Sequence, residues 1–119
     1  MSFRVASKEA KKSCHKQHRL GAVVVKGGRI LATGFNELRP SSVTKTPTLH
    51  AEASAILKLL KKRRLHDLFG ADLYVTRYTR GGSIGLARPC VACMDLIRTV
   101  GISHVHYTTN TNATETMKV

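Results

Sequence analysis

Four residues in two short segments have the types and spacing of a metal-dependent reaction centre. His50 and Glu52 are separated by one alanine, and Cys90 and Cys93 form a C-x-x-C pair directly after Pro89. One imidazole and two thiolates are ligands that suit Zn²⁺, and three protein ligands leave a fourth position open for water, as in catalytic zinc sites. The sequence therefore predicts a catalytic zinc ion held by His50, Cys90 and Cys93.

Glu52 is the candidate proton shuttle of this centre. Two positions after His50, in the first turn of a helix, a carboxylate is not forced onto the metal and can lie beside the bound water. There it would take the proton of the water and pass it to a ring nitrogen and to a leaving amine. Both ligand segments are predicted to stand at helix N-termini, where the partial positive charge favours thiolates and developing negative charge.

Alternating strands and helices are predicted to position the two segments. Apolar β-branched runs indicate strands, Gly27-Gly28 is a hairpin signal, and Gly101 is a stop for the second ligand-bearing helix. The predicted strands are 20–25, 29–36, 71–78 and 102–107, with a fifth at about 116–119, and the predicted helices are 3–14, 50–60 and 90–100.

This order of elements indicates an α/β sheet with helices packed on its faces. About eight residues separate the last two strands, too few for the crossover that a parallel neighbour needs, so the fifth strand should be antiparallel. The segment 79–88 contains three glycines and is expected to be a flexible loop. A length of 119 residues predicts one domain, 1–119.

The two segments together match H-x-E…P-C-x-x-C, the signature of zinc-dependent nucleobase deaminases. Over nearly its whole length the chain resembles the cytidine and deoxycytidylate deaminase superfamily. The resemblance implies a three-layer α/β/α sandwich around a mixed sheet of four to five strands. It implies Zn²⁺ on His50, Cys90 and Cys93, with Glu52 as proton shuttle. It also implies hydrolytic conversion of the cytosine of cytidine, deoxycytidine or a monophosphate to uracil, with release of ammonia.

The resemblance also implies substrate contacts. Asn36 resembles the asparagine that family members place against the sugar, and backbone groups near Ala51 and Cys90 would meet the exocyclic end of the pyrimidine. Free-nucleoside cytidine deaminases carry a glutamate where this chain has Leu38, and Glu37 lies one position earlier. We therefore assign no sugar contact to Glu37.

A second departure from the family pattern is the long segment 79–88. With Arg77, Arg80 and Arg88 it could cover the pocket or bind a phosphate. The antiparallel last strand would resemble the free-nucleoside branch, because nucleic-acid and deoxycytidylate deaminases usually have a helical crossover there. This missing helix favours a small-molecule nucleoside or nucleotide as substrate.

The charge of the chain points the other way. Twenty Lys and Arg against seven Asp and Glu give a net charge of +13, which allows nucleic acid as a partner. The alternatives are thus a deaminase of cytosine or adenine within RNA or single-stranded DNA, and a non-catalytic zinc-binding nucleic-acid module. An aromatic content of 5%, without tryptophan, offers few stacking platforms. The run 61–64 is interpreted as a solvated helix end, with phosphate or nucleic-acid contact as the alternative.

Three further expectations concern environment and assembly. No apolar run approaches the roughly 20 residues that a membrane span needs. The first ten residues carry charges without an apolar stretch behind them, so we expect no signal peptide and a cytoplasmic protein. Many members of the superfamily complete each other's sites as oligomers, which makes a homo-oligomer the expectation.

Two other groups of residues resemble metal ligands. Cys14, His15 and His18 lack a clear fourth ligand and are interpreted as an ordinary thiol and solvated imidazoles, with a second zinc site as the alternative. His104 and His106 alternate along the fourth strand, where surface or interface positions are favoured over ligation.

Overall fold

The structure is a computed structural model that describes residues 2–13, 18–38, 41, 44, 48–79, 81–111 and 113–119. Its helices are α1 (Ser2–Ala10), α2 (Ala51–Lys61), α3 (Leu65–Leu68) and α4 (Val91–Thr99). Its strands are β1 (His18–Lys26), β2 (Arg29–Phe35), β3 (Asp72–Thr79), β4 (Ile84–Gly85), β5 (His104–Thr108) and β6 (Thr114–Lys118).

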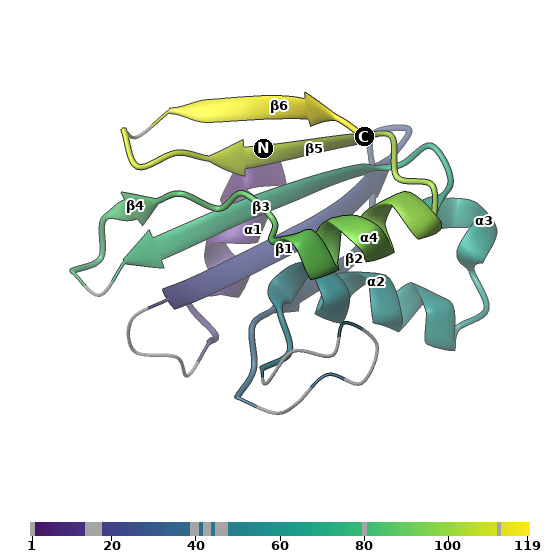
Figure 1. Ribbon diagram of the computed structural model, residues 1–119, viewed down its shortest axis with the longest axis horizontal. Coiled ribbons are helices and arrows are strands. Elements are labelled where there is room, and N and C mark those ends of the chain that lie inside the picture. Colours follow the sequence, from purple (N-terminus) through teal and green to yellow (C-terminus); the bar gives the residue numbers. More distant parts are fainter. Residues whose placement is uncertain are drawn as a thin grey trace.

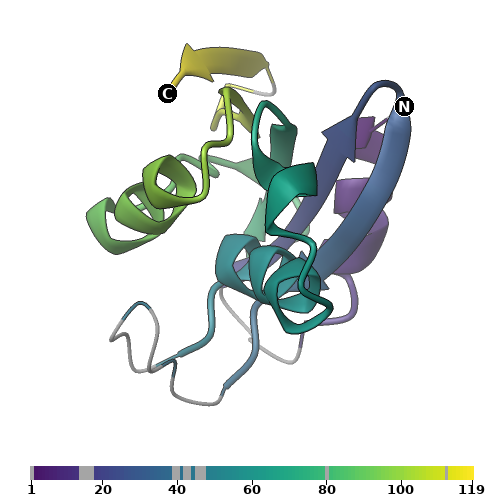
Figure 2. The same ribbon diagram turned by 90° about the vertical axis from the view of Figure 1, so that its right-hand side faces the viewer.

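The strands form one mixed sheet in the order β2-β1-β3-β5-β6, with β4 paired to β3. Strands β3 and β5 are parallel, and the other pairs are antiparallel. Helix α1 packs on one face, and α2, α3 and α4 lie on the other (Figures 1 and 2). The predicted three-layer α/β/α sandwich is confirmed, and so is the antiparallel last strand.

The five predicted strands form the main order of the sheet, and the described residues add a short sixth strand. The additional strand, β4, lies in the segment 79–88 that we expected to be flexible. Gly85 pairs with Arg77 and Ile84 with Tyr78, so backbone pairing to β3 orders this part of the segment. The short helix α3 was also not foreseen, since four residues are too few for a periodic pattern.

Two glycines let helices approach the sheet very closely. A Cβ at Gly21 in β1 would lie 1.9 Å from the carbonyl oxygen of Ala6 in α1. A Cβ at Gly34 in β2 would lie 2.7 Å from the carbonyl oxygen of Ala51 and 2.6 Å from the amide nitrogen of Ala55. The backbone of α2 therefore rests on bare β2 backbone at the helix turn that carries the first ligand segment.

The hydrophobic core lies between the sheet and the helices on the α2 side. Its largest fully buried members are Ile56, Leu59, Leu68, Leu73, Val75, Ile97 and Val105. Residues of α2 and α4 pack into the same cluster, which aligns the two helices side by side on the sheet. In the part of the chain that the structure describes, no helix has the length and apolar character needed to span a membrane.

Candidate active site and metal centre

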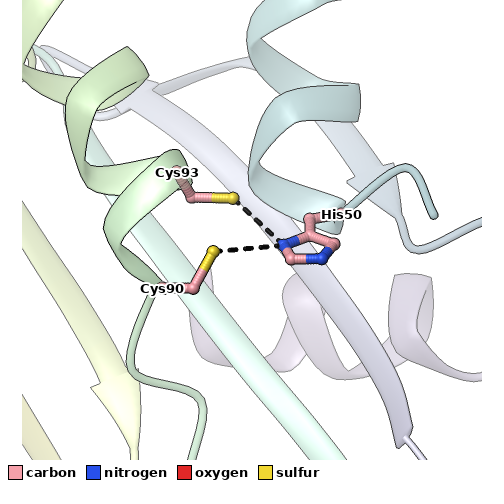
Figure 3. Close-up of side chains that lie close together, drawn as sticks. All are labelled: His50, Cys90 and Cys93. Carbon is pink, nitrogen blue, oxygen red and sulfur yellow. Dashed lines mark hydrogen bonds between the residues drawn. The ribbon is translucent and has the colours of Figure 1, made fainter. Parts of the chain in front are cut away.

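The starts of α2 and α4 place the ligand candidates. His50 is the N-cap of α2 and Cys90 is the N-cap of α4, each with extended backbone, and Cys93 follows in the first turn of α4. N-caps are usually Ser, Thr, Asp or Asn, whose side chains bond to the helix backbone. Neither N-cap side chain here makes such a bond. The imidazole and the thiol face each other across the two helix ends instead (Figure 3).

The three side chains fit a tetrahedral zinc ion. Nδ1 of His50 lies 3.2 Å from Sγ of Cys93 and 3.6 Å from Sγ of Cys90. Typical Zn–N and Zn–S bonds at a tetrahedral angle place such atoms about 3.5 Å apart. All three ligand atoms lie within 4.8 Å of one another. Because Cys93 is buried, His50 half-buried and Cys90 exposed, the site has one closed and one open side.

Glu52 lies beside this site as a buried acid with an unmet acceptor. Its side chain is nearly inaccessible, and Oε1 has no hydrogen-bond partner among the described residues. Burial raises the pKa of Glu52 above its ordinary value, although the neighbouring His50 and a hydrogen bond with Cys93 oppose the rise. A buried acceptor without a partner is costly, so Oε1 is suited to a water or a substrate N–H in the pocket.

The thiol of Cys93 gives a second argument for a cation. Burial raises its pKa, and the nearby Glu52 and Cys90 raise it further. A buried thiol beside a carboxylate and another thiol therefore resists ionisation in the protein alone. A divalent ion between the ligands reverses this balance, because it stabilises the thiolates directly.

A cavity of about 320 Å³ opens over these residues. Its walls are formed by Leu20, Asn36, Thr48, His50, Glu52, Arg77, Leu86, Arg88 and Cys90. This volume is in the range of small-ligand sites. Two of the three candidate metal ligands, the proton-shuttle candidate and two arginines thus line one cavity.

Asn36 lies in the pocket wall and is held from two sides. Its side-chain Oδ1 accepts a hydrogen bond from the amide of Leu20 at 2.9 Å, and Ser13 Oγ donates to its carbonyl oxygen at 2.9 Å. Ala51 is the first residue of α2, and its side chain is fully buried in the core rather than in the wall. Glu37 pairs through its backbone with Leu49 and is not one of the lining residues.

Three wall residues had no functional signal in the sequence. Leu20 begins an apolar strand run, Thr48 lies in a polar loop, and Leu86 follows β4. None belongs to a local motif, because long-range packing alone brings them to the pocket. Arg77 and Arg88, which we expected to cover the pocket or bind phosphate, both line it.

The structure describes only some of the other residues that resemble metal ligands. Cys14, His15, the side chain of His18 and Arg80 lie outside the described residues. Within those residues, His104 and His106 belong to no cluster of three candidate ligands. His106 instead contacts Asp72 at 3.3 Å.

Comparison with known proteins identifies the family. Residues 1–109 match the model of the cytidine and deoxycytidylate deaminase zinc-binding region. The chain belongs to this family. It is 32% identical to the deoxycytidylate deaminase of Mycobacterium phage D29, over 87% of this chain and 88% of that protein. The chain is thus a hydrolytic deaminase with a zinc-binding domain, and His50, Cys90 and Cys93 are positioned to bind the metal ion.

Solved structures of deaminases share the fold. The apo dCMP deaminase of cyanophage S-TIM5 has a TM-score of 0.70 and 29% identity, covering 91% of this chain and 79% of that one. A cytidine deaminase from Burkholderia pseudomallei has a TM-score of 0.73 at 19% identity, covering 98% and 89% of the two chains. The second likeness supports the fold alone.

Proposed function

We propose that this deaminase converts the cytosine of deoxycytidylate to uracil, with release of ammonia, and that residues 1–119 form one catalytic domain. Two comparisons support this substrate. The phage D29 relative is named a deoxycytidylate deaminase, and the cyanophage enzyme has also been solved in complex with dCMP and dUMP. The observation that carries the proposal is a pocket in which Arg77 and Arg88 share the wall with Glu52 and with two of the candidate metal ligands, His50 and Cys90.

In this proposal His50, Cys90 and Cys93 hold the zinc ion. When bound, the ion acts as a Lewis acid that acidifies a water molecule near the cytosine. The partial positive charge at the N-termini of α2 and α4 stabilises the two thiolates and the carboxylate that face it. The three residues would hold the ion next to the pocket that Glu52 lines.

Glu52 moves the protons. Its carboxylate takes a proton from the water as the water oxygen bonds to C4 of the base, and delivers it to the ring nitrogen. It then carries the proton of the new C4 hydroxyl to the exocyclic amine, which leaves as ammonia while C4 becomes a carbonyl. The bond that forms is C4–O and the bond that breaks joins C4 to the exocyclic nitrogen. Because burial raises the pKa of Glu52, the group is suited both to accept a proton and to return it.

Asn36 and the start of α2 position the nucleoside. The bond from the Leu20 amide to Oδ1 fixes the orientation of the Asn36 carboxamide, which we assign to the sugar. Backbone groups around Ala51 and Cys90 are assigned to the exocyclic end of the base. These assignments remain part of the proposal.

The two arginines are assigned to the phosphate. Arg77 Nη1 donates to the carbonyl of Leu86 at 3.3 Å, which joins β3 to the segment that follows β4. Arg88 lies two residues before Cys90 and is exposed at the pocket. Glu52 is the one acidic residue among the lining residues that the structure describes, so the rest of the wall favours an anion.

Ammonia release from dCMP, deoxycytidine, cytidine and a cytosine-containing oligonucleotide tests the proposal. Arg88→Gln should raise KM for dCMP about 10- to 100-fold, as expected for a lost hydrogen bond to a charged group. KM for deoxycytidine should hardly change, since deoxycytidine has no phosphate. Arg98→Gln, at the far end of α4, is the control with the same charge change. Equal use of dCMP and deoxycytidine by the native enzyme would refute the phosphate assignment.

The salt dependence of turnover distinguishes the alternative substrates. The comparisons give no support for nucleic acid as a substrate, and family membership argues against a non-catalytic module. Turnover of a polynucleotide falls steeply with salt, whereas turnover of an uncharged nucleoside hardly changes. The homo-oligomer and the cytoplasmic location stay predictions.

A further inference from the structure

The end of the molecule opposite the active site is strongly basic. It is formed by the C-termini of α2 and α4, by α3 and by the turn between β1 and β2, and Figure 2 views the molecule from this side. We call this surface the basic end. Its lysines and arginines are Lys26, Arg29, Lys61, Lys62, Arg63, Arg64 and Arg98. Lys26 Nζ donates to the carbonyl of His66 at 3.2 Å, which joins the β-turn to α3.

Part of this charge is exposed and forms no ion pair among the described residues. Lys61, Lys62 and Arg63 are exposed, and none forms an ion pair within the described part of the chain. The nearby carboxylates are themselves neutralised, because Asp67 bonds to Arg64 at 2.6 Å and Asp95 faces Arg98 at 4.0 Å. The surface therefore carries a surplus of positive charge that an anionic partner would neutralise.

The backbone conformation of Arg63 indicates that its side chain has a role. Its φ is 56°, the left-handed region that favours glycine. It follows α2, where its amide and that of Arg64 close the helix on the carbonyls of Leu60 and Leu59. An arginine is thus present at a position that suits glycine better.

An exposed aromatic ring, that of Phe69, lies on the same end of the molecule. Phe69 is 73% exposed, and its ring lies on Gly101, where a Cβ would come within 2.7 Å of Cδ2. The amide of Gly70 donates to the carbonyl of Gly101 at 2.8 Å and pins the segment that carries the ring. A groove of about 610 Å³ runs past the ring between α3 and the end of α4, with Leu65 and Arg98 in its walls.

We propose that the basic end binds single-stranded nucleic acid, with a base stacked on Phe69 and the flanking phosphates on Lys61, Lys62 and Arg63. An exposed aromatic ring in a groove, on a surface that also carries exposed lysines and arginines, is the combination that single-strand binders use. A second copy of the chain in a symmetric contact would meet like charge. Binding to an anionic membrane would need the positive charge, but it would need neither the groove nor the exposed ring of Phe69. The surface is separated from the active site by the length of α2, so this proposal is independent of the substrate.

Fluorescence anisotropy with a labelled oligothymidine of about 20 nucleotides tests the site. This probe contains no cytosine or adenine and is therefore no deamination substrate. Lys61→Gln/Lys62→Gln is compared with Lys8→Gln/Lys118→Gln, a pair of exposed lysines on α1 and β6 with the same charge change. The first pair should reduce the slope of log affinity against log salt by about 1.4, about 0.7 for each lost phosphate contact. The control pair should change it far less.

Two single variants address the ring and the strained arginine. Phe69→Leu keeps an apolar side chain but removes the aromatic face, and should weaken binding about fivefold or more while leaving most of the salt slope. Arg63→Gly should weaken binding although it relieves the backbone. Ammonia release should stay unchanged in all of these variants, which confirms that each one is folded.

Three results would overturn the proposal. Equal weakening by the two lysine pairs would show that diffuse charge, not this surface, holds the strand. Unchanged affinity in Phe69→Leu would remove the stacking contact. Binding to phosphatidylserine vesicles without binding to the oligonucleotide would make the surface a membrane contact instead.

Discussion

The N-terminal and C-terminal ends of helices α2 and α4 carry different kinds of side chains. At the N-termini stand His50, Cys90 and Cys93, directed towards one another. At the C-termini stand lysines and arginines directed into solvent. The helix dipole explains the choice of sign, since it favours thiolates and carboxylates at the first end and cations at the second.

Burial separates the two ends more sharply than charge. Glu52 is 3% exposed and its Oε1 has no partner among the described residues, whereas Phe69 is 73% exposed on a pinned segment. The first end therefore holds polar groups that only a ligand can satisfy. The second end holds groups that water already satisfies, so substitutions there should be mild. The predictions below test this contrast.

Loss of a metal ligand should have the largest effect. Cys93→Ala removes a buried sulfur of the three-ligand set, so we expect zinc content to fall from about one per chain towards zero and ammonia release to vanish. Zinc analysis of the purified variant and an ammonia assay measure both. Cys14→Ala is the matched control and should keep zinc and activity. A variant at Cys93 that retains full zinc would contradict the ligand assignment.

Glu52→Gln should separate chemistry from metal binding. Gln keeps the shape of the side chain but cannot accept the proton, so kcat should fall about 10²- to 10⁴-fold while zinc content stays unchanged. Thermal stability should not fall, because the neutral amide avoids the cost of burying a charged carboxylate. Kinetics, zinc analysis and a melting curve test this together. Near-native kcat would exclude Glu52 as the proton shuttle.

Substitution of two glycines tests whether the candidate metal centre depends on the close packing of α2 against the sheet. Gly34→Ala places a methyl against Ala51 and Ala55 of α2, and Gly21→Ala places one against Ala6 of α1. Each should destabilise the fold by about 1–3 kcal/mol in urea denaturation. Zinc affinity, measured by chelator competition, should fall for Gly34→Ala alone, because α2 carries His50 and α1 carries no ligand. An equal loss in both variants would point to general unfolding.

The smallest effect, a change in the free energy of unfolding, is expected at the basic end. Arg63→Gly removes the steric cost of a left-handed backbone conformation but increases the conformational entropy of the unfolded chain. The net effect should be a free energy of unfolding that is higher by about 0.5–1 kcal/mol. Lys62→Gly, one residue earlier at φ −87°, should lower it instead. Urea denaturation of both variants measures the difference. A destabilised Arg63→Gly would show that the arginine side chain contributes to the fold.

Local features of the sequence predicted most of the fold. The hairpin at Gly27-Gly28 is confirmed because both residues adopt positive φ, which glycine adopts readily. The antiparallel β6 is confirmed because a short connection allows no crossover. Strand β4 was missed, since two residues carry no period and are ordered only by pairing to β3.

The sequence by itself determined the ligand set. The candidate ligands His50, Cys90 and Cys93 lie in two short segments whose spacing places them at helix starts, so local geometry and donor chemistry were sufficient to predict them, with Glu52 beside them. The tertiary structure alone decided what surrounds them. Leu20, Thr48, Arg77 and Leu86 come to one cavity from four separate parts of the chain. Part of the positive charge of the chain likewise gained a location only when folding brought the ends of α2 and α4 together with α3. Contacts between residues distant in sequence depend on packing of the whole core, and no local pattern encodes them.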